Sequence, residues 1–546
     1  SKIKGFVNGL RYRGKKGLNY TLIYLLKNQY FLIIAPLVFQ EYTSIWCAIK
    51  RKNMQTTLTP KEQQQVNAYL KSKGLPVDFA VTFSDVTLPE KYSEIRSRSE
   101  IHDFKTRVVS NIHLDIPICS ANMESVTGAE MVIALEREGG MGFIPQTIPI
   151  EERLDMIQKI KRTDSAYIDN PLTVSPAQTL KQAKEIMDKY KIYSLVVVDK
   201  NKKPVGILST RDWLYETNEN KKIKDLMGGK NKVVVAPANT SFEDAEKILR
   251  ENKIEKLPLV NKAGHLAGLI TAHGLFYKNH NPRATRNSKG NFLIAGSIGV
   301  GKEFTTKHMR EVELQVKTGI DILMIDTARA FSINTKEALK AVKKKYPKLP
   351  VIVGNVSTPE GAKFLFENGA DGVKVNQGRG HVCRTSEVGI GIPQLTAIAK
   401  ASAIAKNYNG TVFADGGMKN AGDMVKAIAA GADIVFTGYL LIGSKESAAQ
   451  LYFNKKGLPV KNYEGSASIA SQSKRIAKGN LDRMRRPEGV TEEVVVTGTV
   501  AEIVNDLLDG FKSAMSYQGV RTLKELREKT KFQLQTSAGS FEGLKK

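Results

Sequence analysis

The sequence predicts an α/β fold: a closed (β/α)8 barrel into which a smaller, repeated module is inserted. Three observations predict it. Apolar strand-like segments alternate with helical segments over most of the chain, polar residues follow several of those strands, and an internal repeat interrupts the alternation near the middle. Strand–helix alternation at this spacing is typical of a parallel sheet, and about eight such units close into a barrel.

Seven segments have the short apolar pattern of buried strands. They are residues 116–123, 292–296, 322–328, 351–355, 372–376, 412–417 and 434–438. Helical patterns fall between them at 333–344, 358–368 and 421–430, and residues 54–75 are a polar helical lead-in. A barrel keeps its chemistry at the carboxyl ends of its strands. The polar residues at those ends are Asn122, Asp326, Asn355, Asn376 and Asp415.

The internal repeat lies within residues 165–280, where the stretch 170–212 returns as 232–274. One copy of such a unit cannot bury its hydrophobic face alone, so we expect the two copies to pack together. The recurring positions are Pro176, Ile186, Lys191-Ile192, Asp199 and Gly206, which return as Pro237, Ile248, Lys253-Ile254, Asn261 and Gly268.

The two copies resemble a tandem pair of cystathionine-β-synthase (CBS) modules. This resemblance implies an adenine or guanine nucleotide as ligand, and the alternative is a packing domain whose clefts hold none. The first copy ends with Asp212, whereas the second has Gly274 at that position. At most one of the usual ribose contacts is therefore expected.

The repeat and the change of composition near residue 53 divide the chain. We expect a basic N-terminal extension over 1–53, the first part of the barrel over 54–164, the CBS pair over 165–280, and the second part of the barrel over 281–546. The chain has 546 residues, long enough for two or three domains.

Composition restricts the class of protein. A hydrophobic content of 41% and a charged content of 25% fit a globular protein, but the formal net charge is +27. Such an excess favours an acidic partner, such as nucleic acid, a membrane surface or phosphorylated ligands, with a solvated basic surface as the alternative. Only three cysteines occur, Cys47, Cys119 and Cys383, which excludes a disulfide scaffold and indicates a reducing compartment. We expect a cytoplasmic or mitochondrial-matrix protein.

Residues 1–53 contain ten lysines and arginines and a single acid, Glu41. The apolar stretch 30–39 is interrupted by Pro36 and is shorter than the roughly 20 residues of a membrane span, so no transmembrane span is predicted. An acid-poor start is typical of a transit-type segment. It also resembles the opening helix of a small-subunit ribosomal protein, which implies an RNA or ribosomal partner. The matching residues are Phe6, Val7, Asn8, Leu10, Gly14, Lys15, Lys16 and Tyr24.

The stretch NQGRGHVCRTSEVGIGIPQ, residues 376–394, carries the strongest chemical signal. Backbone N–H groups of a glycine-rich turn at a strand end can stabilise the thiolate of Cys383, although a lone cysteine is more often a small buried hydrophobe. The stretch resembles the catalytic loop of the IMP dehydrogenase/GMP reductase family, K-V-G-x-G-P-G-S-x-C-T-T-R followed by G-x-G-x-P-Q. The matching residues are Gly378, Gly380, Cys383, Thr385, Gly391, Pro393 and Gln394.

The resemblance extends from Thr82 to Glu542 and is closest to the CBS-bearing branch of GMP reductases. Segments that carry it are 83–88, 120–128, 136–144, 325–328, 354–358, 414–433 and 522–529. It implies a TIM barrel, a homotetramer, a purine nucleoside monophosphate as substrate, and NADPH or NAD as cofactor.

The resemblance also implies a role for each matched residue. Cys383 is the nucleophile that adds to C2 of the purine, and Thr385 and Glu488 act on ammonia release. Substrate contacts are implied for Asp415 at the ribose, and for Gly380, His381, Gly416, Gly417 and Gly438 around the phosphate. Asp326 is the implied contact of the nicotinamide ribose, and backbone groups of Gly378, Gly380 and Cys383 could hold a monovalent cation such as K⁺.

The flap GNLDRMRRPEGV, residues 479–490, bears on which reaction the site performs. Dehydrogenases of the family carry an Arg-Tyr pair there, whereas this chain has Arg483 followed by Met484. Reductases keep a glutamate that works with the loop threonine, and Glu488 stands at that place. The prediction is therefore a GMP reductase (GMP + NADPH to IMP + ammonia) acting through a covalent Cys383 adduct. The alternative reaction is that of IMP dehydrogenase (IMP + NAD to XMP).

Several residues depart from the family pattern at the site itself. His381 replaces the phosphate-loop serine, and Tyr439 replaces a small residue after Gly438. Bulky side chains hinder the close backbone approach that a phosphate needs, but His381 could bind phosphate by charge instead. Together with residues 1–53, these departures support a second hypothesis, a catalytically impaired nucleotide-binding subunit of an organellar ribonucleoprotein such as a mitoribosome. The other departures are Asn376, Arg379, Arg384, Ser386 and Arg329-Ala330.

Overall fold

A computed structural model describes residues 10–13, 19–22 and 57–544, apart from 191, 228–232, 288, 302–303, 478–480 and 482. The chain divides into two compact units, Ser1–Gln55 and Thr56–Lys546. In the first unit the described residues are two antiparallel strands, β1 (Leu10–Arg13) and β2 (Asn19–Leu22). Leu10 is thus in a strand, where the ribosomal resemblance implied a helix. The rest of the basic extension, with its transit-type and RNA-binding interpretations, lies outside the described residues.

Eight parallel strands form the central sheet of the second unit, in the order β15-β16-β17-β18-β19-β20-β6-β7. The two ends of this order meet where Phe143 pairs with Ala295 and the Ile144 N–H donates to the Ala295 carbonyl at 2.9 Å. The sheet closes on itself, and the predicted barrel is confirmed. Its strands are β6 (Ile118–Ser120), β7 (Met141–Gly142), β15 (Ala295–Ile298), β16 (Ile322–Asp326), β17 (Val351–Val356), β18 (Gly372–Val375), β19 (Thr411–Asp415) and β20 (Ile434–Thr437).

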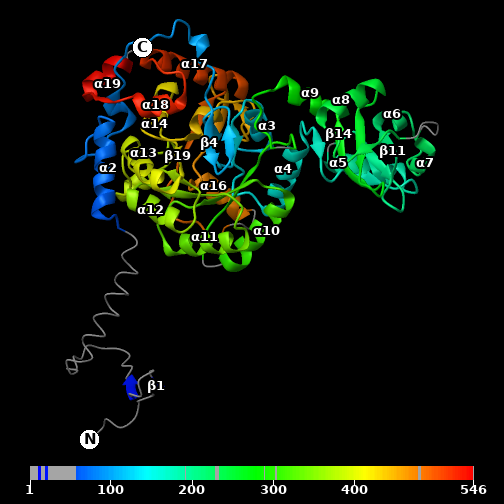
Figure 1. Cartoon of the computed structure of the whole chain (residues 1–546), viewed down its shortest axis with the longest axis horizontal. Coiled ribbons are helices and arrows are strands. Elements are labelled where there is room, and N and C mark those ends of the chain that lie inside the picture. The colour runs from blue at the N-terminus through cyan, green and yellow to red at the C-terminus, as the bar shows by residue number, and fades with distance from the viewer. Residues whose placement is uncertain are drawn as a thin grey trace. The chain divides into compact units, whose positions relative to one another are not determined.

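Helices alternate with these strands and surround the barrel (Figure 1). Their starts are set locally by side-chain caps: Ser332 accepts from the Thr335 N–H, and Asn420 accepts from the Asp423 N–H. The surrounding helices are α3 (Ala129–Arg137), α4 (Ile150–Arg162), α10 (Met309–Thr318), α11 (Ile333–Lys345), α12 (Pro359–Glu367), α13 (Gln394–Ala405), α14 (Ala421–Ala429) and α17 (Val500–Gln518).

The interior of the barrel is filled by side chains. Phe143, Phe413 and Phe436 are fully buried there, and the rings of Phe143 and Phe436 meet edge to face with centroids 5.0 Å apart. Aromatic pairs in this arrangement add to the stability that burial alone provides. A filled interior leaves the carboxyl edge of the strands as the place for a ligand.

The inserted repeat forms two units with the same element order. The first consists of β9 (Thr173–Val174), α5 (Leu180–Tyr190), β10 (Ser194–Val198), β11 (Pro204–Ser209) and α6 (Thr210–Trp213). The second consists of β12 (Ala236–Pro237), α8 (Phe242–Glu251), β13 (Lys256–Val260), β14 (Leu266–Thr271) and α9 (Ala272–His280). The register of the hairpin shifts at Val197/Val198 and at Leu259/Val260, which are equivalent positions. Each unit buries a core of its own.

The two copies differ at Asp212 and Gly274 for structural reasons. Asp212 completes a capping box with Ser209, whose N–H it accepts at 2.6 Å. At Gly274 a Cβ atom would lie only 2.0 Å from the Ser165 carbonyl oxygen. The second copy therefore requires glycine where helix α9 approaches residue 165, which explains the missing aspartate.

A three-stranded antiparallel sheet, not foreseen from the sequence, connects the barrel to the flap. Its strands are β21 (Leu451–Phe453), β22 (Pro459–Glu464) and β23 (Thr491–Val495). Among the described helices, none is long and apolar enough to cross a membrane. The remaining elements include α2 (Pro60–Ser72), β3 (Val86–Thr87), β4 (Thr106–Val109), β5 (Ile112–Leu114), β8 (Tyr167–Ile168), α7 (Ile223–Leu226), α15 (Tyr439–Ile442), α16 (Ile469–Ala477), α18 (Leu523–Lys529), β24 (Gln533–Leu534) and α19 (Ser537–Leu544).

Glu136, on α3, is a fully buried carboxyl group that makes stability depend on pH. Burial raises its pKa well above the usual value. The folded chain thus keeps a proton that the unfolded chain has lost. Stability should be highest near or below the ordinary carboxyl pKa and should fall as the pH rises towards the raised pKa.

We expect Glu136→Gln, which cannot ionise, to raise the midpoint of thermal unfolding by roughly 2–4 °C at pH 8 and by less near pH 5. Scanning calorimetry across that pH range measures the difference. Glu337→Gln, at an exposed position on α11, is the matched control. An equal shift for Glu136→Gln at both pH values would contradict the pH dependence.

Candidate active site

Four polar side chains project from neighbouring strands at the carboxyl edge of the barrel. Asp326 ends β16, Asn355 lies in β17, Lys374 lies in β18, and Asp415 ends β19. The strands are consecutive and parallel, so their carboxyl ends bring these side chains together. The expectation that polar strand-end residues meet at one edge therefore holds for Asp326, Asn355 and Asp415.

The ammonium group of Lys374 lies between the two carboxylates. Its Nζ is 3.0 Å from Oδ1 of Asp326 and 2.8 Å from Oδ2 of Asp415. Burial lowers the pKa of Lys374, but the two carboxylates outweigh burial and the pKa lies above its usual value. The lysine is therefore a fixed cation that holds both carboxylates in place.

Amide groups complete the hydrogen bonds of these carboxylates. The Asn355 Nδ2 donates to Asp415 Oδ2 at 2.8 Å, and the Gln146 Nε2 donates to Asp326 Oδ2 at 3.2 Å. An ionised carboxylate has about four lone-pair sites, so each can still accept a bond from a ligand hydroxyl. These two carboxylates could therefore accept hydrogen bonds from two ribose groups, one at Asp326 and one at Asp415.

The loop between β18 and α13 presents Cys383, which is half-buried. Its ends come close together: a Cβ atom on Gly391 would lie 2.2 Å from the Gln377 carbonyl oxygen. Gly391 also has a φ of +127°, a conformation that glycine adopts readily. The glycine-rich sequence thus folds the loop back on itself and holds the cysteine above the barrel.

Cys383 begins a chain of hydrogen bonds. Its thiol donates to the Thr385 hydroxyl, with an Sγ–Oγ1 distance of 3.4 Å, and that hydroxyl donates to the Glu488 carboxylate at 2.9 Å. The structure thus brings together the three residues predicted to be catalytic. A carboxylate linked through a hydroxyl to a thiol can supply or remove a proton beside that thiol.

Backbone pairing between the loop and the flap places Glu488. The Arg384 N–H donates to the Glu488 carbonyl at 2.7 Å, and the Val490 N–H donates to the Val382 carbonyl at 3.0 Å. Cys383 and Gly489 form an antiparallel bridge between these two bonds. The loop and the flap therefore behave as a short two-stranded ribbon across the site.

The predicted phosphate-binding glycines lie beside the same loop. A Cβ atom on Gly416 would lie 3.5 Å from the Gly380 Cα, and one on Gly417 would lie 3.0 Å from the Arg379 carbonyl oxygen. The Gly416 N–H already donates to the Phe436 carbonyl at 2.8 Å, because it continues the bonding of the barrel strands. Because this N–H is already paired, Gly416 does not offer it to a phosphate as expected. The predicted phosphate contact then falls to the N–H groups of Gly417 and Gly438.

The two bulky replacements near this cradle contact each other. The ring of His381 stacks on the ring of Tyr439, with centroids 3.9 Å apart, and the His381 Nε2 lies 2.8 Å from a carboxylate oxygen of Glu492. Tyr463, which is buried, lies 6.3 Å from both rings. Burial raises the pKa of Tyr463, with a further contribution from Asp415.

In the part of the chain that the structure describes, no group of three or more His, Cys, Asp or Glu side chains could hold a metal ion. This absence does not bear on the predicted potassium site, because backbone carbonyls would hold that ion. Of these, the Gly380 carbonyl already accepts the Cys383 N–H at 3.1 Å. The potassium site stays a prediction.

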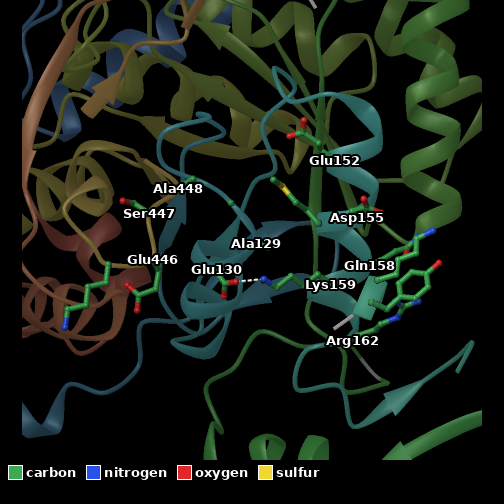
Figure 2. Close-up of a pocket in the computed structure, with 15 residues that line it drawn as sticks. Ala129, Glu130, Glu152, Asp155, Gln158, Lys159, Arg162, Glu446, Ser447 and Ala448 are labelled. Atoms are coloured by element: carbon green, nitrogen blue, oxygen red, sulfur yellow. Dashed lines mark hydrogen bonds and ion pairs between the residues drawn. The ribbon is translucent and has the colours of Figure 1, made fainter. Parts of the chain in front are cut away.

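A cavity of about 640 Å³ lies away from Cys383, between α3, α4, the end of α5 and residues 445–448. Figure 2 shows Glu130 paired with Lys159 within it. Its lining includes four acids (Glu130, Glu152, Asp155, Glu446) and four bases (Lys159, Arg162, Lys189, Lys445), so its charge favours neither an anion nor a cation.

Four residues of the site were not identified from the sequence. Lys374 had a usable signal, because a charged residue in an otherwise apolar barrel strand must find a partner inside. Nothing in the local sequence identified the other three, which reach the site from distant segments. These are Gln146, Tyr463 and Glu492.

A half-buried cysteine above the carboxyl edge of a (β/α)8 barrel, with a threonine and a carboxylate beside it, defines a barrel enzyme with a thiol nucleophile. The model of the IMP dehydrogenase / GMP reductase domain matches residues 80–545. The chain belongs to this family of oxidoreductases.

Curated relatives bear the name inosine-5′-monophosphate dehydrogenase. The protein from Aquifex aeolicus (strain VF5) is 39% identical over 466 residues, which cover 84% of this chain and 94% of the relative. The protein from Halalkalibacterium halodurans is 37% identical over 467 residues, which cover 84% and 94%.

Similar solved structures are GMP reductases from Trypanosoma brucei. A cysteine-to-alanine variant in complex with guanosine 5′-monophosphate has a TM-score of 0.78 at 30% identity, and the match covers 87% of this chain and 98% of that one. A complex with guanosine 5′-triphosphate has a TM-score of 0.69 at 28% identity, with 85% and 99% covered. The chain is thus similar both to dehydrogenases and to reductases.

The bridging lysine gives a direct test of how the site is assembled. Lys374→Met would leave two carboxylates facing each other without a cation, and we expect it to lower the free energy of unfolding by roughly 3–5 kcal/mol. A urea titration of the barrel measures this, with Lys340→Met at an exposed position on α11 as the control. Adding Asp326→Asn should restore part of the loss. Equal urea midpoints for Lys374→Met and the wild type would contradict the bridging role.

Proposed function

We propose that this chain is a purine nucleotide oxidoreductase of the GMP reductase type, which converts GMP and NADPH to IMP and ammonia through a covalent adduct at Cys383. The observation that carries the proposal is the hydrogen bond of 2.9 Å between Thr385 and Glu488, next to the thiol. Removal of an amino group requires a proton donor, and a carboxylate linked through a hydroxyl to the nucleophile can supply one.

The proposed reaction uses the chain's own residues for binding and proton transfer. The Cys383 thiol passes its proton through Thr385 to the Glu488 carboxylate, and the resulting thiolate forms a bond to C2 of GMP. The 2-amino group takes that proton back through Thr385 and leaves as ammonia. When bound, NADPH supplies the hydride that C2 needs. Breaking of the C2–sulfur bond then returns the thiolate and releases IMP. In balance, GMP, NADPH and a proton give IMP, ammonia and NADP⁺.

Asp415 and Asp326 would orient the two reactants. We assign the ribose hydroxyls of the nucleotide to Asp415 and those of the nicotinamide ribose to Asp326, since Lys374 and the amide donors leave lone pairs on both carboxylates. The N–H groups of Gly417 and Gly438 would face the phosphate. Because one ammonium fixes both carboxylates, the two reactants would be held next to each other.

The IMP dehydrogenase reaction is the alternative, and the names of the curated relatives favour it. In that reaction IMP would give up a hydride to NAD, and water would release the product XMP from Cys383. The flap argues against it, because Met484 follows Arg483 where dehydrogenases have the Arg-Tyr pair. The CBS pair remains a proposed site for an adenine or guanine nucleotide, and the homotetramer a proposed assembly.

The two reactions are distinguished by assay of the purified full chain. We expect GMP and NADPH to give IMP, NADP⁺ and ammonia, and IMP and NAD to give little XMP. Chromatography of the nucleotides and an ammonia assay measure both. XMP as the main product would favour the dehydrogenase, and no turnover with either pair would contradict both reactions.

The roles of Thr385 and Glu488 have their own test. Thr385→Ala and Glu488→Gln should each lower kcat with GMP and NADPH by about 10²–10⁴-fold, because they remove the proton donor. KM for GMP should change much less. Glu387→Gln, an exposed acid in the same loop, is the control. Full turnover in Glu488→Gln would exclude a role in ammonia release.

A further inference from the structure

The rings of His381, Tyr439 and Tyr463 come from three separate segments and form one cluster. His381 and Tyr439 stack with their planes 30° apart, and Tyr463 lies 6.3 Å from each of them. Stacking between two rings and burial of the third restrict how His381 can move. The imidazole is therefore held in a defined position.

This cluster borders the cradle that the proposed function gives to the phosphate. Tyr439 directly follows Gly438, and a Cβ atom on Gly438 would lie 2.6 Å from the Tyr463 hydroxyl oxygen. Residues 379 and 380, just before His381, lie against Gly417 and Gly416. A phosphate at these glycines would lie beside the imidazole.

The carboxylate of Glu492 already accepts the hydrogen bond that the His381 imidazole could give to a phosphate. Oε2 of Glu492 lies 2.8 Å from the His381 Nε2, and the Glu492 side chain is 47% exposed. A carboxylate and a phosphate both accept charge-assisted hydrogen bonds from the same ring nitrogen. An exposed carboxylate can be displaced at modest cost, because solvent stabilises it after it leaves.

Glu492 also connects this end of the site to the catalytic end. It is the second residue of β23, four positions after Glu488, whose carboxylate holds Thr385. Between them, Gly489 and Val490 pair with the loop. Glu492 and Glu488 therefore contact the loop on either side of Cys383, through His381 and Thr385.

We propose that His381 sets the preference of the site for a 5′-phosphate, and that Glu492 is an internal anion which holds His381 until that phosphate displaces it. The inference rests on the proposed function, which places the phosphate beside Gly417 and Gly438. The ligand class is a purine nucleoside monophosphate. His381 supplies the hydrogen bond that the loop serine supplies in the family pattern. A nucleoside without a phosphate has no group that could replace Glu492 at His381, so it gains no binding energy there.

Titration calorimetry of the full chain with GMP and with guanosine tests this without requiring turnover. We expect His381→Ala, which removes the donor, to lower the preference for GMP over guanosine by about tenfold, the value of one charge-assisted hydrogen bond. Glu492→Gln should raise that preference by a similar factor, because the competing anion is gone. Glu493→Gln removes the same charge one residue away, where it meets Tyr452, and should leave the preference unchanged.

A loss of GMP affinity in the His381 variant could arise from misfolding, but a gain of GMP affinity in Glu492→Gln could not. The two variants together therefore distinguish the proposal from a folding defect. Tighter GMP binding in His381→Ala would overturn the proposal, since the ring would then obstruct the phosphate. An unchanged preference in both variants would overturn it too. If the wild type binds neither ligand, this inference and the proposed function both fail. If GMP binding follows His381 but NADPH is not oxidised, only the proposed function fails.

Discussion

One buried ammonium group joins the two carboxylates on which the site is built. Lys374 lies within 3.0 Å of Asp326 and of Asp415, and so connects the carboxyl ends of β16 and β19 across β18. Two carboxylates could not lie this close inside a barrel without a cation, because each would repel the other at low dielectric. The fixed charge holds the two carboxylates in place, and with them the two proposed ribose contacts.

The chemistry depends on a second constraint, the pairing of the loop with the flap. Cys383 and Glu488 are far apart in the sequence, yet backbone bonds on both sides of Cys383 hold them in register. The hydrogen bond from Thr385 to Glu488 follows from that register. Changes of side chain nearby, such as His381 for serine, leave this backbone pairing intact. The side chains at the proposed phosphate site can therefore change while Cys383, Thr385 and Glu488 keep their positions.

Most of the fold could be predicted from the sequence because barrel strands are short apolar runs. The strand expected at 351–355 is Val351–Val356, and the helix expected at 333–344 is Ile333–Lys345. The strand expected at 292–296 begins only at Ala295, because Phe292 pairs with Arg286 instead. Strand β7 has two residues and gave no signal. The local sequence pattern thus predicts the bounds of an element well where no other segment competes for its backbone hydrogen bonds.

The site was less accessible to sequence reasoning. Cys383, Thr385 and Glu488 could be named because the family resemblance covers them, but their contacts required the fold. Nothing near Glu492 indicates that it meets His381, since 110 residues and an unforeseen antiparallel sheet separate them. Burial of Lys374 was visible only as a charge in an apolar strand. Contacts between distant segments are set by packing, which local pattern does not contain.

The proposed function depends above all on purine chemistry at the sulfur of Cys383. An anaerobic single-turnover reaction of the full chain with GMP and NADPH, stopped in acid and analysed by peptide mass spectrometry, tests it most directly. We predict a purine nucleotide attached to the peptide that contains Cys383, formed as ammonia is released and lost as IMP appears. IMP formation with that peptide unmodified at every time, or an adduct on another residue, would contradict the account.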